Sequence, residues 1–387
     1  MNARTDFPSR PLAIAACLSL ALSIAGHLLP PVAYPAASLL WDYEFGLIRR
    51  GLVGTLLNPF FGETATLGEL HLATAAVTLV GAFSLAAFGA LRLWGERGAA
   101  LLLILLLNSF AFRSFVGATG YLDGILVALT VAALLSPAAT GAGLALRVGV
   151  CVVAMFVHES MLPYFGVLIA LDLWLARLDR PVRQRLMAAA APLLAALAAL
   201  VVIEMGTARA LSDVAAFQAH LNGKHGLGVD LPHLPILEGG IAGQLAVMAE
   251  MRAGDDHVQW LAFDGLPLWL MSLWLIWLNL RVLPVEAGAL TRLGILGAIL
   301  APLSLNLIAF DVVRFGSVSV IVGFLVLALQ RQYLPQAAER IAAVMTWPHF
   351  LILLILNLHV TTMQINGVYG HEDDLPWLFF EHLKWAF

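Results

Sequence analysis

The amino-acid sequence predicts an all-α fold, that of a polytopic integral membrane protein with about 11 transmembrane helices. Of its 387 residues, 61% are hydrophobic and only 12% are charged, whereas soluble domains carry about 25% charged residues. The apolar residues also occur in long blocks, several of which reach the ~20 residues that a helix needs to cross a bilayer. We therefore expect residues 1–387 to form a single membrane domain.

The apolar blocks give the expected helices in order. They lie near 11–31, 71–93, 98–115, 121–136, 143–157, 161–176, 187–204, 263–281, 293–310, 316–331 and 343–360. The first block follows a short polar N-terminus, as in a signal sequence. It is long, however, and no small-x-small cleavage site follows, so we expect an uncleaved helix. Three blocks, 121–136, 143–157 and 161–176, are short for a full span and are candidates for half-helices.

The arginines predict a cytoplasmic N-terminus and a C-terminus at the outer face, because basic residues favour cytoplasmic loops. In that orientation most of the 21 basic residues fall in short inner connections, above all in RLDRPVRQR at 177–185. Most of the 25 acidic residues fall outside. The outer side also receives the longest polar segments, namely a first loop at 32–70 with interfacial helices, a loop at 205–262 and a tail at 361–387. Any chemistry is therefore expected at the outer face.

Charge and cysteine content exclude several classes of partner. The net charge of -4 and the pI of about 6.2 give no sign of nucleic-acid binding. Cys17 and Cys151 both lie within apolar blocks, so a disulfide framework is not expected. The sequence contains no cysteine–histidine spacing typical of a metal centre and no other cofactor motif. No cofactor is therefore assigned from the sequence.

The first outer loop contains the stretch WDYEFGLIRRGLVG, in which Asp42, Glu44, Arg49 and Arg50 stand close together. We expect residues 43–57 to form a helix along the membrane surface. In that helix, two glycines would allow another helix or a lipid headgroup to approach closely. The alternative is a re-entrant or interfacial segment whose charges are only solvated.

Three further polar groups lie at the outer ends of predicted helices: Arg113 with Asp123, His158 with Glu159, and Asp311 with Arg314. A histidine and a glutamate at membrane depth cost several kcal/mol unless they are paired or face water, which favours a function. The last pair has the i, i+3 spacing of a direct ion pair. A charged turn or a structural ion pair is the simpler alternative for each group. A zinc protease is disfavoured, because Leu162 stands where the second histidine of His-Glu-x-x-His is required.

Other polar residues carry a weaker signal. The loop histidines and the acidic tail are interpreted as solvated side chains: His220, His225, His233, His257 and residues 371–374. Carboxylates are ligands for hard divalent cations, so the outer acids are candidates for binding a divalent metal ion. Together the outer groups suit a site at the lipid–water boundary. There a carboxylate can act as a general base on a hydroxyl, and arginines can bind the phosphate of a lipid-linked substrate.

The topology and the acidic first loop with Asp42 and Glu44 resemble the GT-C superfamily of polytopic glycosyltransferases, over roughly the first 200 residues. The resemblance implies transfer of a sugar from a polyprenyl-phosphate-linked donor to a glycan, lipid or protein acceptor. The expected location is the inner membrane of a bacterium, with the active face in the periplasm. In the resemblance, Asp42 and Glu44 match the acidic position, so Asp42 is the first candidate for general base and Glu44 the second. From their chemistry and position, we further expect donor-phosphate binding by Arg49, Arg50, Arg113 and Arg314, and positioning of acceptor, sugar or metal by Asp123, His158, Glu159 and Asp311.

Three other functions stay open. A polysaccharide polymerase or O-antigen ligase would also use an outer loop rich in arginine and histidine. A lipid-linked-glycan flippase or transporter would use ionisable residues near the midplane and broken helices, for which Glu204 and the short blocks around His158 are the candidates. In a purely structural membrane protein, loss of Asp42 or Arg314 would affect folding or nothing.

Overall fold

The structure is a computed structural model, which describes residues 9–28, 38–44, 46–61, 64–211, 213–225, 265–307, 309, 311–368 and three isolated positions between 245 and 249. Every regular element within these ranges is a helix. The main elements are α1 (Ser9–His27), α3 (Gly51–Leu57), α4 (Leu67–Leu93), α5 (Arg97–Leu107), α6 (Phe110–Gly117), α7 (Asp123–Leu135), α8 (Gly141–Val157), η3 (Leu162–Gly166), α9 (Val167–Leu175), α10 (Val182–Ala210), α11 (Val214–His225), α15 (Leu266–Val282), α16 (Ala289–Leu300), α17 (Val312–Tyr333), α18 (Ala337–Val344) and α19 (Trp347–Val368). Most of the predicted outer loop after residue 225 and the predicted tail after residue 368 lie outside the described residues.

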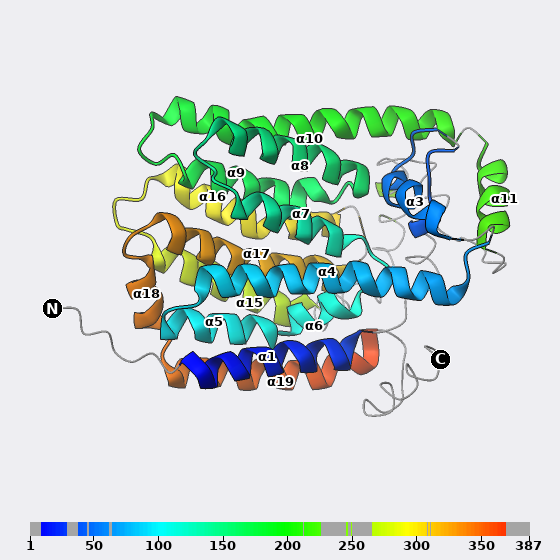
Figure 1. The fold of residues 1–387 in the computed structure, drawn as a ribbon. Helices are drawn as coiled ribbons and strands as arrows, with labels where there is room; N and C mark the ends of the chain where they lie inside the picture. Colours follow the sequence, from blue (N-terminus) through cyan, green and yellow to red (C-terminus); the bar gives the residue numbers. More distant parts are fainter. Residues whose placement is uncertain are drawn as a thin grey trace.

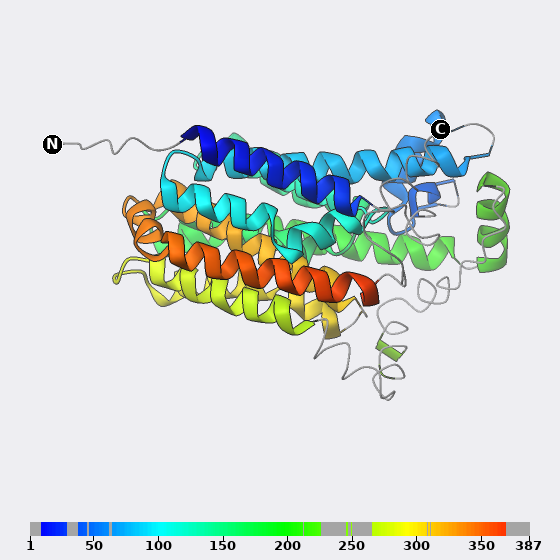
Figure 2. The same ribbon diagram turned by 90° about the horizontal axis from the view of Figure 1, so that it is seen from below.

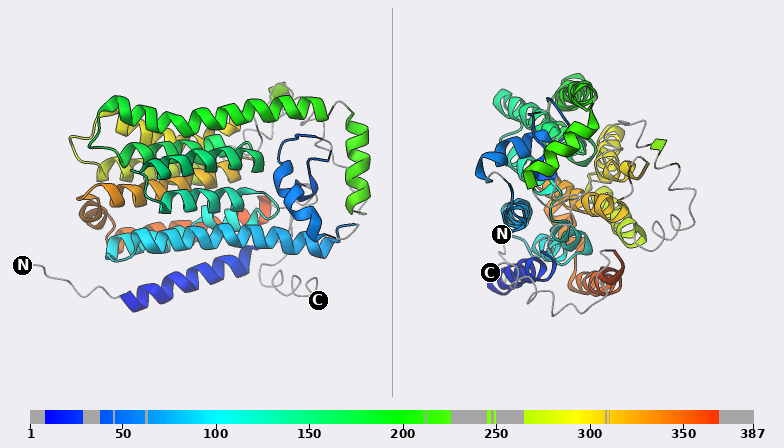
Figure 3. Two further views of the ribbon diagram at one scale, coloured as in Figure 1. Left: turned by 45° about the horizontal axis from the view of Figure 1, so that its top comes forward. Right: turned by 90° about the vertical axis from the view of Figure 1, so that its right-hand side faces the viewer.

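The long helices lie side by side and run back and forth along one axis (Figures 1 and 2). α1 begins at the end of the bundle that also holds α18, which we call the proximal end. α3 and α11 lie at the opposite, distal end, where α11 crosses the direction of the other helices (Figure 3). The starts of α4, α7 and α17 and the ends of α8 and α10 also lie at the distal end. Residues far apart in sequence are thereby brought to one level.

Helix α17 forms the centre of the bundle. Its residues from Val312 to Gln330 are buried, apart from Arg314, and it contacts α4, α6, α9, α15 and α16. Polar side chains along it bond to neighbouring helices: Ser319 donates to the Ile299 carbonyl at 2.6 Å, and Gln330 donates to the Asn279 side chain at 2.9 Å. A helix that is apolar all round in this way must be enclosed by other helices.

Four helices are long and apolar enough to cross a membrane: α1, α4, α10 and α17. The number rises to six if two bent pairs each count as one span, namely α5 with α6, bent by 43°, and α18 with α19, bent by 71°. The other apolar helices, including α7, α8, α15 and α16, have 10–17 residues. The all-helical fold with several apolar spans thus agrees with the sequence prediction, while the count of eleven spans and the orientation stay predictions.

Several predicted helix boundaries are wrong. The block 98–115 is broken after Leu107, because Ser109 caps a new helix by accepting the Phe112 amide at 3.1 Å. The block 293–310 ends at Leu300 and continues as a 3-10 helix from Pro302 to Leu307. The block 187–204 is too short, since α10 extends over Val182–Ala210. The last block begins at Trp347 rather than 343, where the chain turns between α18 and α19.

A buried ion pair fixes the proximal end. Arg147 and Asp172 are both fully buried, with 2.5 Å between Nη2 and Oδ2, and Tyr333 donates to the other Asp172 oxygen at 2.9 Å. Arg147 also donates to the Ser136 side chain and carbonyl at 3.0 and 3.1 Å. These contacts join α7, α8, α9 and α17, so charges with no access to water are compensated within the bundle.

Helices α4 and α7 approach closely at two glycines. A Cβ atom on Gly124 would lie 2.1 Å from the Val77 carbonyl oxygen, and one on Gly81 would lie 2.6 Å from the Gly124 Cα. Both obstacles are backbone atoms, which cannot rotate away. The spacing of α4 and α7, and with it the position of neighbouring Asp123, therefore depends on these glycines.

The substitution Gly124→Ala is expected to lower the free energy of unfolding by about 1–3 kcal/mol, because α7 must move away from α4. Gly149→Ala is the matched control, since no atom lies within 4 Å of its Cβ, and alanine in a helix gains roughly 0.5–1 kcal/mol over glycine. Chemical unfolding in detergent micelles measures both. Equal stability of the two variants would contradict the close approach.

Candidate functional site

The charged stretch of the first loop is an ordered turn followed by a short helix. α3 begins only at Gly51, so the expected helix over 43–57 is wrong in its first half. The Tyr43 amide instead donates to the Thr55 hydroxyl at 3.0 Å, which folds the turn back onto α3. Trp41 and Ile48 are buried beside it. Trp41, Asp42 and Ile48 of the turn therefore pack into the protein, whereas Glu44 stays exposed.

The glycines of α3 allow this folding back. A Cβ atom on Gly54 would lie 2.0 Å from the Trp41 carbonyl oxygen, and one on Gly51 would lie 2.5 Å from the Tyr43 ring. The close partner of α3 is thus the preceding segment of its own chain rather than another helix or a lipid headgroup. This contact presses Asp42, between Trp41 and Tyr43, against the distal end of the bundle.

Asp42 is the centre of an acid cluster formed by Asp42, Glu44, Asn58, His220 and Lys224. Only 2% of Asp42 is exposed. Its Oδ1 accepts the Glu44 amide at 3.0 Å, and its Oδ2 accepts the Asn58 side chain at 2.5 Å and the Lys224 ammonium. Burial by itself would raise the pKa of Asp42, but the hydrogen bonds from Lys224 and the Glu44 amide lower it below its usual value. Asp42 is therefore ionised at neutral pH.

The acid cluster also has the donor atoms of a cation site. Ligand atoms of Asp42, Glu44 and His220 lie within 4.8 Å of one another. Two carboxylates and an imidazole suit a divalent transition metal better than calcium. Lys224 contacts Asp42 and lies 3.1 Å from Glu44, so its ammonium group already neutralises the carboxylates. A metal ion could bind here only if Lys224 moved away.

Arg50 and Glu159 form a two-pronged ion pair between the first loop and the end of α8. Nε lies 3.1 Å from Oε2 and Nη2 lies 2.5 Å from Oε1. The Arg50 guanidinium also lies over the Trp41 ring, 5.8 Å from its centroid. Burial by itself would raise the pKa of Glu159, but the Arg50 charge holds it well below its usual range. Arg50 achieves this geometry with φ of 62°, in the left-handed region.

Arg314 and Asp123 form a second two-pronged pair, which joins the starts of α17 and α7. Nε lies 2.6 Å from Oδ2 and Nη2 lies 2.7 Å from Oδ1. The guanidinium stacks on Tyr121, 4.0 Å from the ring centroid, and lies 5.9 Å from that of Tyr164. Asp311 caps α17 by accepting the Arg314 amide at 3.3 Å and lies 3.7 Å from Nη1. The predicted i, i+3 pair exists, but Asp123 is the main partner of Arg314.

Three buried polar groups between His158 and Tyr164 have no hydrogen-bond partner among the described residues: His158 Nε2, Ser160 Oγ and the Tyr164 hydroxyl. His158 Nδ1 accepts the Ser160 amide at 3.0 Å, so in the neutral ring Nε2 carries the proton. Burial lowers the pKa of His158 to about 3, and Arg50 adds to the effect. The segment continues into η3, a π-helical turn of the kind often found at functional sites.

The remaining predicted site residues, Arg49 and Arg113, belong to neither of these two-pronged pairs. Arg49 is buried and forms an ion pair with Glu204 on α10, while its amide donates to the Thr207 hydroxyl at 2.9 Å. Glu204, the candidate for a transport residue, is therefore an ion-pair partner in the structure. Arg113 on α6 has no ion pair within the described ranges, and its charge acts on His27 at the end of α1.

The structure brings several predicted residues together at the distal end, namely Asp42, Glu44, Arg50, Asp123, Glu159 and Arg314, and adds neighbours that the sequence does not indicate. Asn58, Lys224, Tyr121 and Tyr164 were not expected, and His220, interpreted as solvated, faces the acid cluster. One signal was present: His220 and Lys224 have i, i+4 spacing, which places both on one face of α11. Nothing in the sequence indicates that this face meets Asp42.

Comparison with known proteins gives no match: no protein-family model matches the chain, and neither a curated protein nor a solved structure matches it significantly. What the fold and site define is therefore limited to an all-helical protein with several apolar spans and a cluster of ion pairs at one end.

The substitution Arg314→Gln is expected to lower the free energy of unfolding by about 3–5 kcal/mol, because it leaves Asp123 buried without its partner. The double variant Asp123→Asn/Arg314→Gln should lose less, since neither charge then remains. Arg180→Gln is the control, because Arg180 and its partner Asp179 are exposed, and such pairs contribute up to about 1 kcal/mol. Chemical unfolding in micelles gives the three values, and a double variant no more stable than Arg314→Gln would exclude a buried pair.

His158 should make stability depend on pH between about 6.5 and 3. Its pKa in the folded chain, about 3, lies below the ordinary 6.5, so only the unfolded chain gains a proton as the pH falls. The contribution of neutral His158 to the free energy of unfolding is complete above pH 6.5 and is lost as the pH falls toward 3. Glu159 acts only below its ordinary 4.5. From pH 6.5 to 4.5 the Tm of the wild type should therefore fall more steeply than that of His158→Gln. Parallel curves would show that His158 gains its proton in the folded chain over the same pH range as in the unfolded chain.

Proposed function

We propose that this protein is a membrane glycosyltransferase, which moves a sugar from a polyprenyl-phosphate-linked donor to an acceptor hydroxyl at the distal end of the bundle. The observation that carries the proposal is the group of unpartnered buried donors at His158, Ser160 and Tyr164, beside two guanidinium groups. A buried polar group without a partner costs about 1–3 kcal/mol. A ligand rich in hydroxyl and phosphate oxygens would supply the missing acceptors.

Arg113 is the best candidate for binding the donor phosphate. Arg49, Arg50 and Arg314 already have carboxylate partners, whereas Arg113 has none in the described part of the chain. A guanidinium group without a carboxylate is free to donate two parallel hydrogen bonds to a phosphate. Arg50 and Arg314 would instead hold Glu159 and Asp123 in place beside the sugar.

An apolar groove begins one turn before Arg113 on α6. It has a volume of about 340 Å³ and is lined by α6, α15, α17 and α19, with Phe110, Leu268, Val320 and Leu353 among its residues. Phe110 and Arg113 are three positions apart and so lie on the same side of the helix. An apolar tract next to a cation is the arrangement that a phosphate on a long hydrocarbon chain requires, which supports an isoprenoid lipid as the donor carrier.

Asp42 is the proposed general base. It would take the proton of the acceptor hydroxyl as that oxygen attacks the anomeric carbon, and the bond from that carbon to the phosphate oxygen breaks. Ionisation at neutral pH suits Asp42 to this step, and Lys224 keeps it ionised. Asp42 follows Trp41, over which Arg50 lies, so the proposed base adjoins the Arg50–Glu159 pair. A glycan, lipid or protein hydroxyl fits this role equally.

The proposal places the distal end at the outer, periplasmic face of a bacterial inner membrane. It counts each passage of the chain along the bundle as a span, about eleven in all, with the N-terminus inside. The basic stretch at 177–185, which covers the connection from α9 to α10 and the first residues of α10, then lies in the cytoplasm. A polysaccharide polymerase or ligase would use the same residues with a different acceptor and belongs to the same proposal.

Asp42→Asn and Arg113→Gln test the proposal in membranes supplied with a polyprenyl-phosphate sugar. Asp42→Asn should reduce product by about 100-fold or more, the size of a general-base contribution, and should still retain the lipid on purification. Arg113→Gln should lose the lipid and with it the product. Binding of the lipid is followed by native mass spectrometry and product by chromatography.

The matched controls are Asp179→Asn and Arg180→Gln, exposed residues between α9 and α10, which should leave lipid and product unchanged. Thermal unfolding confirms that each variant is folded. Unchanged product in folded Asp42→Asn would refute its role as base. Unchanged lipid retention in folded Arg113→Gln would refute the donor site. If the protein transports a lipid-linked glycan and forms no product, it is a flippase and not a transferase.

A further inference from the structure

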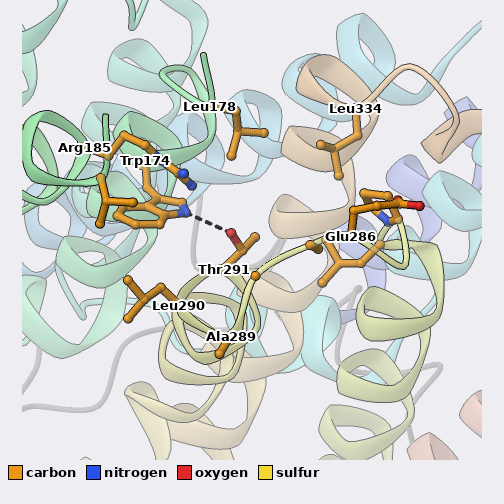
Figure 4. A pocket seen from close by; sticks show the side chains of 13 residues that line it. Trp174, Leu178, Arg185, Glu286, Ala289, Leu290, Thr291 and Leu334 are labelled. Carbon is orange, nitrogen blue, oxygen red and sulfur yellow. Dashed lines mark hydrogen bonds between the residues drawn. The ribbon is translucent and has the colours of Figure 1, made fainter. Parts of the chain in front are cut away.

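A second pocket lies at the proximal end of the bundle, opposite the end that holds the candidate site. Figure 4 shows this pocket from close by. Its volume is about 440 Å³, and it is lined by the end of α9, the start of α10 and the connection from α15 to α16. We call it the proximal pocket; its argument depends on Trp174, Arg185, Glu286 and Thr291. None of these residues belongs to the site proposed for glycosyl transfer.

On one wall of the proximal pocket, the Arg185 guanidinium stacks on the Trp174 ring. The Arg185 guanidinium lies 3.6 Å from the centroid of the Trp174 ring. The Trp174 indole donates to the Thr291 hydroxyl at 3.0 Å, and Thr291 keeps its own O–H as a donor. Arg185 has no ion pair within the part of the chain that the structure describes, and its Nε has no hydrogen-bond partner there. The guanidinium is thus stacked on Trp174, and no carboxylate in the described part of the chain pairs with it.

The opposite side of the proximal pocket carries a negative charge. Figure 4 shows Glu286 across the pocket from Trp174 and Arg185. Glu286 is exposed, and none of the ion pairs found among the described residues includes it. The proximal pocket therefore offers one cation and one anion, on separate walls, to whatever occupies it.

Apolar side chains surround the proximal pocket on the outside of the bundle. Leu178, Val182 and Leu290 line it with 38%, 49% and 47% of their surfaces exposed. The exposed apolar surface continues along α10 at Leu194 and along α16 at Leu293. A small soluble molecule would not need these surfaces, whereas two hydrocarbon chains extending from the pocket would cover them.

We propose that the proximal pocket binds a phospholipid with a phosphoethanolamine headgroup. The phosphate would accept hydrogen bonds from Arg185 and Thr291, and the primary ammonium would donate to Glu286. The acyl chains would lie along α10 and α16. Glu286 disfavours a purely anionic headgroup by repulsion, and a choline headgroup has no N–H to donate, so the charge pattern selects an aminophospholipid. This inference does not depend on the proposed transferase activity.

Native mass spectrometry of the whole protein tests this site, with phosphatidylethanolamine, phosphatidylcholine and phosphatidylglycerol of the same acyl chains added in equal amounts. The wild type should retain phosphatidylethanolamine about tenfold more than either other lipid, which is the effect of roughly one charge-assisted hydrogen bond. Arg185→Gln should lose most of the bound lipid. Glu286→Gln should keep lipid but no longer prefer phosphatidylethanolamine over phosphatidylcholine.

Arg183→Gln is the matched control, since Arg183 lies two residues from Arg185, is exposed and does not line the pocket. It should retain lipid as the wild type does, and thermal unfolding must show all variants folded. Equal retention of the three lipids by the wild type would overturn the proposal. A preference for phosphatidylglycerol, or lipid retention by Arg185→Gln equal to that of the control, would also overturn it.

Discussion

The structure depends on compensating an arginine at the start of a buried helix. α17 is enclosed by other helices along nearly its whole length, and Arg314 lies within its first turn. A charge without water or a partner is far too costly to keep there. Asp123 supplies the compensation and Tyr121 the stacking surface. Because Asp123 starts α7, and α7 lies against α4 at Gly124, the compensation of one charge sets the relative positions of three helices.

The same rule, applied repeatedly, organises the distal end. Arg49 binds Glu204 on α10, Arg50 binds Glu159 beyond α8, and Lys224 on α11 binds Asp42. Each pair ties the first loop to a different part of the chain, and so holds in place a segment with little regular structure of its own. Next to these compensated charges, the buried polar groups of His158, Ser160 and Tyr164 have no hydrogen-bond partner among the described residues. Charge is concentrated in the first loop because that loop is the junction of the distal end.

The sequence predicted the helical class, because that follows from hydropathy, and it predicted that the charged groups at helix ends lie at one end of the bundle, because that follows from where the chain reverses direction. It did not predict partners. Arg113 and Asp123 are close in sequence, yet Asp123 pairs with Arg314, since the direction of a side chain depends on how helices are rotated about their axes. The turn before Gly51 is not the helix that the sequence analysis predicts over residues 43–57. Contacts of Gly51 and Gly54 with the preceding residues outweighed that local preference. The break at Ser109 was readable as a helix cap but lay inside an unbroken apolar block.

Position 50 makes two demands that no single amino acid meets without cost. Its φ of 62° favours glycine or asparagine, while Glu159 and the Trp41 ring require a guanidinium group. Left-handed backbone at a residue with a side chain costs roughly 1–2 kcal/mol, and it persists only where the surroundings compel it. At this position the contacts of the arginine side chain outweigh the cost of its left-handed backbone conformation. A glycine at position 50 would relieve the backbone strain of the turn and at the same time leave Glu159 without its ion-pair partner. The backbone conformation of the loop and the pairing of Glu159 therefore depend on the same residue.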